Sequence, residues 1–206
     1  MKEFNEWLFE LKVPLNRDAH NTIASFLRNI GYSHLFKSSE PQKAITYVVY
    51  RHAVDGDRII AKSSEPIEHE SVQPHSFHID VEQPVKVVVQ VSSKRKIRPP
   101  KILHEPTISK RTKTIIREMT EVEKFEKASQ VLAELGFKPD QTVFDVLGGI
   151  PIEIHHKRDN LKIMEPTMNI VIHGVITDID KFIVGYKTGI GNKRAYGLGC
   201  VRIFPN

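Results

Sequence analysis

The feature that most constrains the fold is an order of strands and helices that occurs twice along this chain of 206 residues. The first occurrence opens with an apolar run over residues 4–13, which predicts a strand that Pro14 must end because proline cannot donate to a sheet. Asn16 then offers an N-cap for a helix over residues 17–30, whose apolar residues recur at spacings of three and four. The chain therefore begins with a strand and an amphipathic helix.

Further strands complete the first occurrence. β-Branched and aromatic residues over 44–52 and a short apolar run over 58–62 predict two strands, joined by a hairpin turn at 54–57. A short helix is one option at 66–71, within an otherwise polar stretch, and residues 85–91 predict another strand. The first part of the chain thus fits the order β-α-β-β-(α)-β.

The order starts again near residue 120. Thr120 is expected as an N-cap with Glu123 at the third helical position, and an apolar stripe predicts a helix from there to Gly136. Strands are expected at residues 143–147, 152–156, 162–164 and 170–177, before a short helix at 180–187 and a last strand at 201–204. This order indicates an α+β fold of two tandem ferredoxin-like halves, which is also the fold of RNA-recognition motifs.

Positive charge is concentrated between the two halves. The formal net charge of the chain is +5, but the segment 94–117 holds nine basic residues, opposed by Glu105 and little else. They are Lys94, Arg95, Lys96, Arg98, Lys101, Lys110, Arg111, Lys113 and Arg117. We therefore expect a solvated basic linker at 94–118, between domains at 1–93 and 119–206, and an acidic partner such as RNA.

The glycine-rich tail is the strongest candidate for a nucleic-acid contact. Between residues 189 and 199, two Gly-x-Gly pairs bracket a basic pair and a tyrosine, so backbone N–H groups and cations can meet a phosphate. The residues expected to bind RNA here are Gly189, Gly191, Asn192, Lys193, Arg194 and Tyr196. The alternative is a tight connection between a helix and a strand. A dinucleotide site is excluded because the spacing differs and a terminal strand follows.

A second candidate contact is the basic tip of a hairpin near residue 158. The residues expected to bind RNA there are His156, Lys157, Arg158 and Lys162. Such a tip can enter a groove of nucleic acid, while the alternative is an ordinary polar hairpin. The aromatic run that RNA-recognition motifs carry on their central strands is missing, so we expect RNA in the cleft between the halves rather than on an open sheet.

His20 is the candidate catalytic residue. It lies in the first turns of the predicted helix, on a side partly away from the apolar stripe, so its imidazole can face a cleft. An imidazole exchanges protons near neutral pH, and RNA cleavage needs a proton taken from a 2′-hydroxyl or given to the departing 5′-oxygen. The alternative is a solvent-exposed helix histidine.

The sequence predicts neither a metal nor a cofactor. His69, His75 and His78 form a cluster that a zinc ion can be imagined to use, but no cysteine is near and solvated loop histidines explain it equally well. Walker loops, H-E-x-x-H helices and spaced carboxylates that hold two metals are all missing from the sequence. A metal-independent reaction is therefore expected.

The lone cysteine and the charge pattern favour the cytoplasm. Cys200 has no second cysteine to pair with, and its apolar surroundings predict a buried thiol in a reducing compartment. No run approaches the roughly 20 apolar residues of a membrane span. We expect neither export nor membrane anchoring.

Two segments resemble a known family, the CRISPR-associated RNA-processing endoribonucleases of the CasE type, which serve the Cascade surveillance complex. Residues 171–178 (VIHGVITD) resemble the family's F-x-G-V-L strand, and residues 188–202 (TGIGNKRAYGLGCVR) resemble its terminal G-I-G-x-x-K-x-x-G-x-G-L-L element. The resemblance implies tandem ferredoxin-like domains, a bound repeat stem-loop cut without a metal, and a 2′,3′-cyclic phosphate upstream of the cut. Other subunits of a CRISPR complex are implied as partners.

The resemblance also implies which residues act. His20 matches the family's catalytic histidine on the first helix, as general base or general acid. One turn earlier, where the family often has a tyrosine, this chain has Arg17. Arg17 is therefore expected to stabilise charge on the phosphate, a role that Lys37 or Lys193 can also fill. Two alternatives stay open: a non-catalytic RNA-binding subunit of the same superfamily, and a basic scaffold that binds nucleic acid by charge alone.

Overall fold

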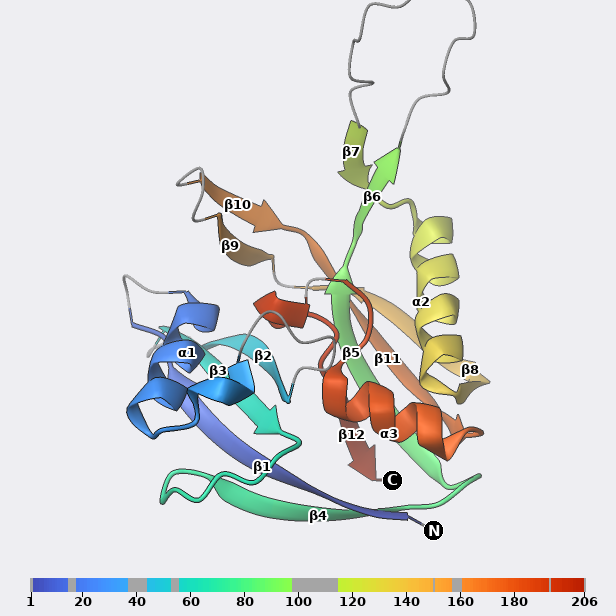
Figure 1. Ribbon diagram of the computed structural model, residues 1–206. Coiled ribbons are helices and arrows are strands. Elements are labelled where there is room, and N and C mark those ends of the chain that lie inside the picture. Colours follow the sequence, from blue (N-terminus) through green and yellow to red (C-terminus); the bar gives the residue numbers. More distant parts are fainter. Residues whose placement is uncertain are drawn as a thin grey trace, which may run out of the picture.

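The protein is described by a computed structural model that covers residues 2–14, 18–36, 44–52, 56–97, 115–149, 151–156, 161–192 and 194–205. The described residues form two four-stranded antiparallel sheets, each with helices packed on it, and two shorter hairpins. Figure 1 shows the sheets side by side, with both termini at the same end of the molecule. Within these residues, no helix is long and apolar enough to cross a membrane.

The first sheet has the strand order β2-β3-β1-β4. Its strands are β1 (Lys2–Lys12), β2 (Ile45–His52), β3 (Gly56–Ser63) and β4 (Gln73–Ile79). Helix α1 (Ala19–Asn29) packs on it through the fully buried Ile23 and Leu27, and Phe26 stacks on Phe9 of β1 with ring centroids 5.1 Å apart. The short helix η1 (Ser33–Phe36) follows and adds Leu35 to this core.

The second sheet has the order β12-β5-β11-β8. Its strands are β5 (Pro84–Ser92), β8 (Phe137–Gly148), β11 (Thr167–Ile176) and β12 (Val201–Pro205). Helices α2 (Glu121–Leu135) and α3 (Ile179–Thr188) lie against it, and their buried residues, among them Leu132 and Phe182, share one core with Val89 and Ile170. Figure 1 shows α2 and α3 next to each other beside this sheet.

Most predicted elements are confirmed, with two corrections of boundaries. The predicted N-cap at Asn16 is wrong, because helix α1 begins at Ala19 and the Asp18 carboxylate accepts a 2.6 Å hydrogen bond from the Asn21 N–H. Strand β8 starts at Phe137, six residues before the predicted start at 143, directly after Gly136 ends α2 in a left-handed conformation (φ 64°). The capping box of Thr120 and Glu123 is confirmed.

The optional helix at 66–71 is wrong. Residues 66–71 form no helix, and Ile67 within them and Val72 directly after them are buried in the first core. The Val72 N–H is instead bonded to the His69 carbonyl at 3.0 Å, in a turn that ends this segment. Strand β4, which was not predicted, follows at Gln73 and pairs with β1.

The strand at 85–91 was assigned to the first half but lies in the second sheet. As β5, it pairs with β11 and β12, and Val85, Val87, Val89 and Val91 are all buried in the second core. Its sequence neighbours β3 and β4 belong to the other sheet. The chain thus crosses between the sheets near residue 80, before the basic segment.

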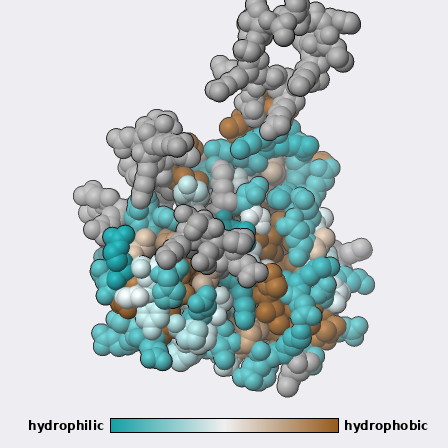
Figure 2. Space-filling view, viewed as in Figure 1, coloured by the Kyte–Doolittle hydropathy of each residue, from teal (hydrophilic) through white to brown (hydrophobic). Residues whose placement is uncertain are grey.

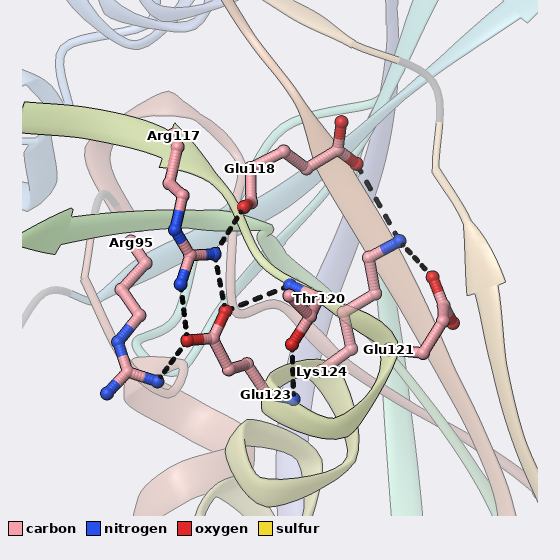
Figure 3. Close-up of polar contacts among 7 residues, drawn as sticks. All are labelled: Arg95, Arg117, Glu118, Thr120, Glu121, Glu123 and Lys124. Carbon is pink, nitrogen blue, oxygen red and sulfur yellow. Dashed lines mark hydrogen bonds and ion pairs between the residues drawn. The ribbon is translucent and has the colours of Figure 1, made fainter.

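The two ends of the predicted basic linker are paired rather than loose. Strands β6 (Lys94–Ile97) and β7 (Ile115–Glu118) form a hairpin stem in which Arg95 lies opposite Arg117. The Glu123 carboxylate at the start of α2 binds both guanidiniums at 2.6 Å and so relieves the repulsion between them (Figure 3). We call Arg95, Arg117 and Glu123 the hairpin base. The linker residues 98–114 lie outside the described residues.

Candidate nucleic-acid interface

The glycine loop, residues 189–199, connects α3 to β12 and is closed on itself. The Ile190 N–H donates to the Gly199 carbonyl at 2.9 Å, and the Gly199 N–H donates to Gln90 of β5 at 2.7 Å. A Cβ on Gly199 would lie 1.9 Å from the Ile190 carbonyl oxygen, so only glycine permits this closure. The sequence motif therefore shapes a compact loop anchored to the second sheet.

The loop also reaches the first half of the molecule. Gly197 lies on the ring of Tyr47 in β2, where a Cβ would come within 2.8 Å of a ring carbon. Burial raises the pKa of the Tyr47 phenol well above its usual range, and the nearby Asp18 and Tyr196 add to that rise. Tyr47 is thus buried and neutral, and it lies close to both the start of α1 and the glycine loop.

His20 and Tyr196 lie next to each other, close to Tyr47. The half-buried His20 in the first turn of α1 has its ring centroid 6.2 Å from that of Tyr196, with the planes tilted by 40°. The imidazole also contacts Phe36, with ring centroids 4.6 Å apart. The structure therefore brings the predicted catalytic histidine and one predicted RNA-binding residue together. These two residues come from opposite halves of the chain.

The other predicted residues of the loop have different surroundings. The Arg194 guanidinium donates to the carbonyls of Thr188 and Gly189 at 3.2 and 3.3 Å, so it ties the loop to the end of α3 as well as adding charge. Gly189 is buried and Asn192 is exposed, while Lys193 lies outside the described residues, as do Arg17 and Lys37.

A hollow of about 720 Å³ lies on the α3 side of the loop. Its walls come from α2, α3 and residues 189–194, and they carry both signs of charge, with Lys127 and Lys181 near Glu134 and Asp180. Figure 2 shows hydrophobic surface over α3 within a mostly hydrophilic face, and Val184 of α3 is 55% exposed. This mixed lining lacks the consistently positive charge that a phosphate backbone needs.

A buried polar contact, which we call the junction, holds the two halves together. It comprises Glu6, Lys62, Tyr186 and Val201. The Tyr186 hydroxyl donates to Glu6 at 2.8 Å, and the Lys62 ammonium lies 3.0 Å from the Tyr186 ring centre and donates to the Val201 carbonyl at 2.7 Å. Burial lowers the pKa of Lys62 from 10.5 to about 8, although Cys200 and Glu6 partly oppose it.

Sequence reasoning did not single out the junction. The signal was weak, because Glu6 and Lys62 lie in strands that carry other charged residues, such as Glu10 and Arg58. Such residues are expected to face solvent, since charged side chains are rarely buried without a partner. Here each has a partner from another strand or helix, and Glu6 and Lys62 lie 4.0 Å apart. The prediction of a buried Cys200 is confirmed, and its thiol contacts the Thr46 hydroxyl.

The described part of the basic segment is partly neutralised. Lys94 binds the buried Glu165 at 3.0 Å, and Arg95 belongs to the hairpin base. Lys96 is exposed. Five further predicted residues lie outside the described residues: Arg98, Lys101, Lys110, Arg111 and Lys113.

The predicted basic hairpin near residue 158 is present as two strands. β9 (Ile152–His156) pairs with β10 (Leu161–Glu165), with His156 opposite Leu161 and Lys162 opposite His155. The tip residues Lys157 and Arg158 lie outside the described residues. In Figure 1 this hairpin projects on the same side of the molecule as α1.

The three histidines considered for zinc have separate partners. His69 bonds Ser71 at 2.6 Å, His75 lies 3.8 Å from Glu6, and His78 lies 3.8 Å from Glu3. In the part of the chain that the structure describes, no group of three or more His, Cys, Asp or Glu residues has the geometry to hold a metal ion.

Comparisons with known proteins identify the fold. No family model matches the sequence, and no curated protein matches it. Among solved structures, the CRISPR-associated protein Cas6e from Escherichia coli K-12 superposes with a TM-score of 0.63 at 16% identity, covering 97% of this chain and 100% of that one. Thermus thermophilus Cse3, bound to an RNA that represents a pre-cleavage complex, gives 0.61 at 16% identity, with 98% and 100% covered.

A chain of a CRISPR RNA-guided surveillance complex is also similar, with a TM-score of 0.60 at 15% identity, covering 96% of this chain and 98% of that one. Likeness at such low identity over nearly the whole chain is a likeness of fold. The chain therefore has the α+β architecture of two tandem ferredoxin-like domains that its sequence predicted.

Proposed function

We propose that this protein is a metal-independent endoribonuclease that binds the stem-loop of CRISPR repeat RNA and cleaves precursor transcripts into guide RNAs. The observation that carries the proposal is the meeting of His20 with the glycine loop across the two halves. The His20 imidazole, a side chain of a type that can act as a general acid or base, lies beside the basic, glycine-rich loop. The similar solved structures, described as a CRISPR endoribonuclease bound to RNA, support the same activity.

The reaction needs only proton transfers and charge stabilisation. The 2′-oxygen attacks the adjacent phosphorus and loses its proton, and the P–O5′ bond breaks as the 5′-oxygen gains a proton. The products are a 2′,3′-cyclic phosphate and a 5′-hydroxyl, so no water or cofactor is consumed. His20 performs one of these transfers, and Arg17 is proposed to stabilise charge on the phosphate.

RNA is proposed to lie across the glycine loop, the basic segment 94–118 and the tip of the β9–β10 hairpin. Lys96 and Asn192 are exposed and available for such contacts. Other subunits of a CRISPR complex are proposed partners, since a similar chain belongs to an RNA-guided surveillance complex. We place the activity in the cytoplasm, in line with the buried, unpaired Cys200.

The test is cleavage of a cognate repeat RNA in EDTA by the purified protein and two variants. We expect the wild type to cut and His20→Ala to lose cutting by at least about 100-fold, with hairpin affinity kept within a few-fold. The matched control is His34→Ala, an exposed histidine of η1, which should cut at the wild-type rate. A copy of the RNA with a 2′-deoxy group at the cut should resist all three proteins.

Two results would redirect the proposal. Tight hairpin binding without cleavage by the wild type would identify a non-catalytic RNA-binding subunit. Equal affinity for hairpin and unstructured RNA, with a steep loss of binding in salt, would identify a basic scaffold that binds by charge alone.

A further inference from the structure

We propose that Tyr196 is a second catalytic residue of this site, which donates the proton that the 5′-oxygen takes up while His20 accepts the proton of the 2′-hydroxyl. This inference rests on the proposed function and deepens it. Sequence considerations had given Tyr196 only an RNA contact and had sought the second group at Arg17, Lys37 or Lys193. The structure places the phenol of Tyr196 next to His20, while those three residues lie outside the described residues.

The geometry suits an acid and a base that share one phosphodiester. The entering 2′-oxygen and the departing 5′-oxygen lie on opposite sides of the phosphorus, so the two groups must approach from different directions. His20 comes from α1 of the first half and Tyr196 from the short helix η2 (Arg194–Tyr196) of the second half, with ring centroids 6.2 Å apart. The planes of the two rings are tilted by 40°, so the rings are not stacked face to face.

Both rings are held by residues around them. Phe36 contacts the His20 imidazole on one side at 4.6 Å. Arg194, at the start of η2, bonds the carbonyls of Thr188 and Gly189, and Gly197, directly after Tyr196, lies on the buried Tyr47 ring. Catalytic groups act best when their surroundings fix them before the substrate arrives. The glycine loop therefore positions the tyrosine.

The chemistry of a phenol fits the acid role. Its hydroxyl is protonated at neutral pH and can donate one hydrogen bond or proton. In the proposed step the P–O5′ bond breaks, its electron pair passes to the 5′-oxygen, and the Tyr196 proton neutralises that oxygen. His20 holds the 2′ proton afterwards, and exchange with water restores both residues.

The experiment uses Tyr196→Phe, which keeps the ring and its contact with His20 but removes the hydroxyl. Single-turnover rates are measured on the repeat RNA and on the same RNA with a sulfur in place of the bridging 5′-oxygen, because a thiolate leaves without a proton. We expect Tyr196→Phe to cut the oxygen substrate about 100-fold more slowly than wild type, to cut the sulfur substrate within a few-fold of wild type, and to keep hairpin affinity. The control is Tyr50→Phe, which removes a hydroxyl of β2 that is bonded to Glu10 of β1, and it should match the wild type on both substrates.

The outcomes separate the two proposals. If Tyr196→Phe cleaves the oxygen substrate at the wild-type rate, the hydroxyl has no catalytic role. An equal defect on the oxygen and sulfur substrates would overturn the acid role. If the wild-type protein cuts neither substrate, the proposed nuclease function fails instead.

Discussion

The junction and the hairpin base use the same types of charged residue in opposite surroundings. In the junction, the side chains of Lys62 and Glu6 are 8% and 5% exposed, and each contact joins segments far apart in the sequence. In the hairpin base, Arg95 and Arg117 are 48% and 38% exposed, and Glu123 is a near neighbour of Arg117. A buried polar contact destabilises the fold unless its partners are well placed, because both groups have lost their contact with water. An exposed contact contributes little free energy, so it tolerates changes in its geometry.

The difference separates two tasks. The junction, together with Phe4 and Ile79 of the first sheet, which are buried in the second core, joins the two halves and so helps to place His20 beside Tyr196. The hairpin base only attaches the β6–β7 hairpin to the start of α2, close to the exposed Ile115 and Ile116. Changes at the junction should therefore alter the whole molecule, and changes at the hairpin base should remain local.

The largest effect is expected from Gly199→Ala, two residues before the junction carbonyl of Val201. The added Cβ would meet the Ile190 carbonyl oxygen at 1.9 Å, at a residue whose φ is +77°. Overpacking and a left-handed backbone together predict a loss of about 3 kcal/mol or more in the free energy of unfolding. Urea unfolding measures it.

Gly191→Ala is the matched control in the same loop. Its φ is +73°, but nothing lies within 4 Å of the added Cβ, so only the backbone cost of about 1 kcal/mol applies. Equal losses for the two variants would contradict the close packing of Gly199.

The pH dependence of Lys62 comes next in size. The folded pKa is about 8 and the usual value is 10.5, so between these values the unfolded chain holds the extra proton. Unfolding then takes up a proton, and the free energy of unfolding rises with pH across this window. At 1.36 kcal/mol per pKa unit, the rise is about 3 kcal/mol and is lost again as the pH falls to 8.

The measurement compares the wild type with Lys62→Met by urea unfolding between pH 7.5 and 10.5. Subtracting the variant removes the titration of other lysines and tyrosines, while Glu6, Tyr186, Cys200 and Arg202 still surround the position. Lys138→Met, at an exposed lysine of β8, should leave the pH dependence of the wild type unchanged. A difference between wild type and Lys62→Met that stays flat with pH would show that Lys62 is not buried.

The same contrast explains what could be predicted from the sequence. The capping box of Thr120 and Glu123 was predictable because its contacts span three residues, as was the end of α2 at Gly136. Strand β5 was predictable as a strand, but not its sheet, because its partners β11 and β12 lie far along the chain. The glycine loop was recognised by its motif.

The neighbours of the glycine loop could not be predicted. Gly197 lies on Tyr47, and Tyr196 beside His20, through contacts between residues that are far apart in the sequence. A periodic pattern reports which face of an element is buried, and says nothing of which distant face covers it. The candidate catalytic histidine was thus found from the sequence, and its neighbouring tyrosine was not.

A smaller effect is expected from Thr120→Ala, at the N-cap of α2 next to the hairpin base. The Thr120 hydroxyl accepts from the Glu123 N–H, and its loss as an N-cap should cost about 1 kcal/mol. The loss should appear in urea unfolding without a change in RNA cleavage, because α2 lies in the other half from His20. The exposed Ser129→Ala, within the same helix, serves as control and should cost less. A loss of cleavage in Thr120→Ala would contradict the local character of the hairpin base.

The smallest effect is expected from the titration of Glu123. Hydrogen bonds from Arg117 and from the Thr120 N–H lower the pKa of its carboxyl from 4.5 to about 2. The folded state then holds fewer protons than the unfolded chain, so the stabilisation by Glu123 is complete above pH 4.5 and is lost as the pH falls to 2. Both guanidiniums and the carboxylate are within reach of solvent, so salt should weaken this stabilisation further. Urea unfolding from pH 5 to pH 2.5 should therefore show that the free energy of unfolding falls less steeply with pH in Glu123→Gln than in the wild type. The control is Glu126→Gln, at an exposed glutamate of the same helix, which should follow the wild type. If the free energy of unfolding falls equally with pH in the wild type and in Glu123→Gln, the carboxylate does not bridge the two arginines in solution. Other contacts would then have to attach the β6–β7 hairpin to α2.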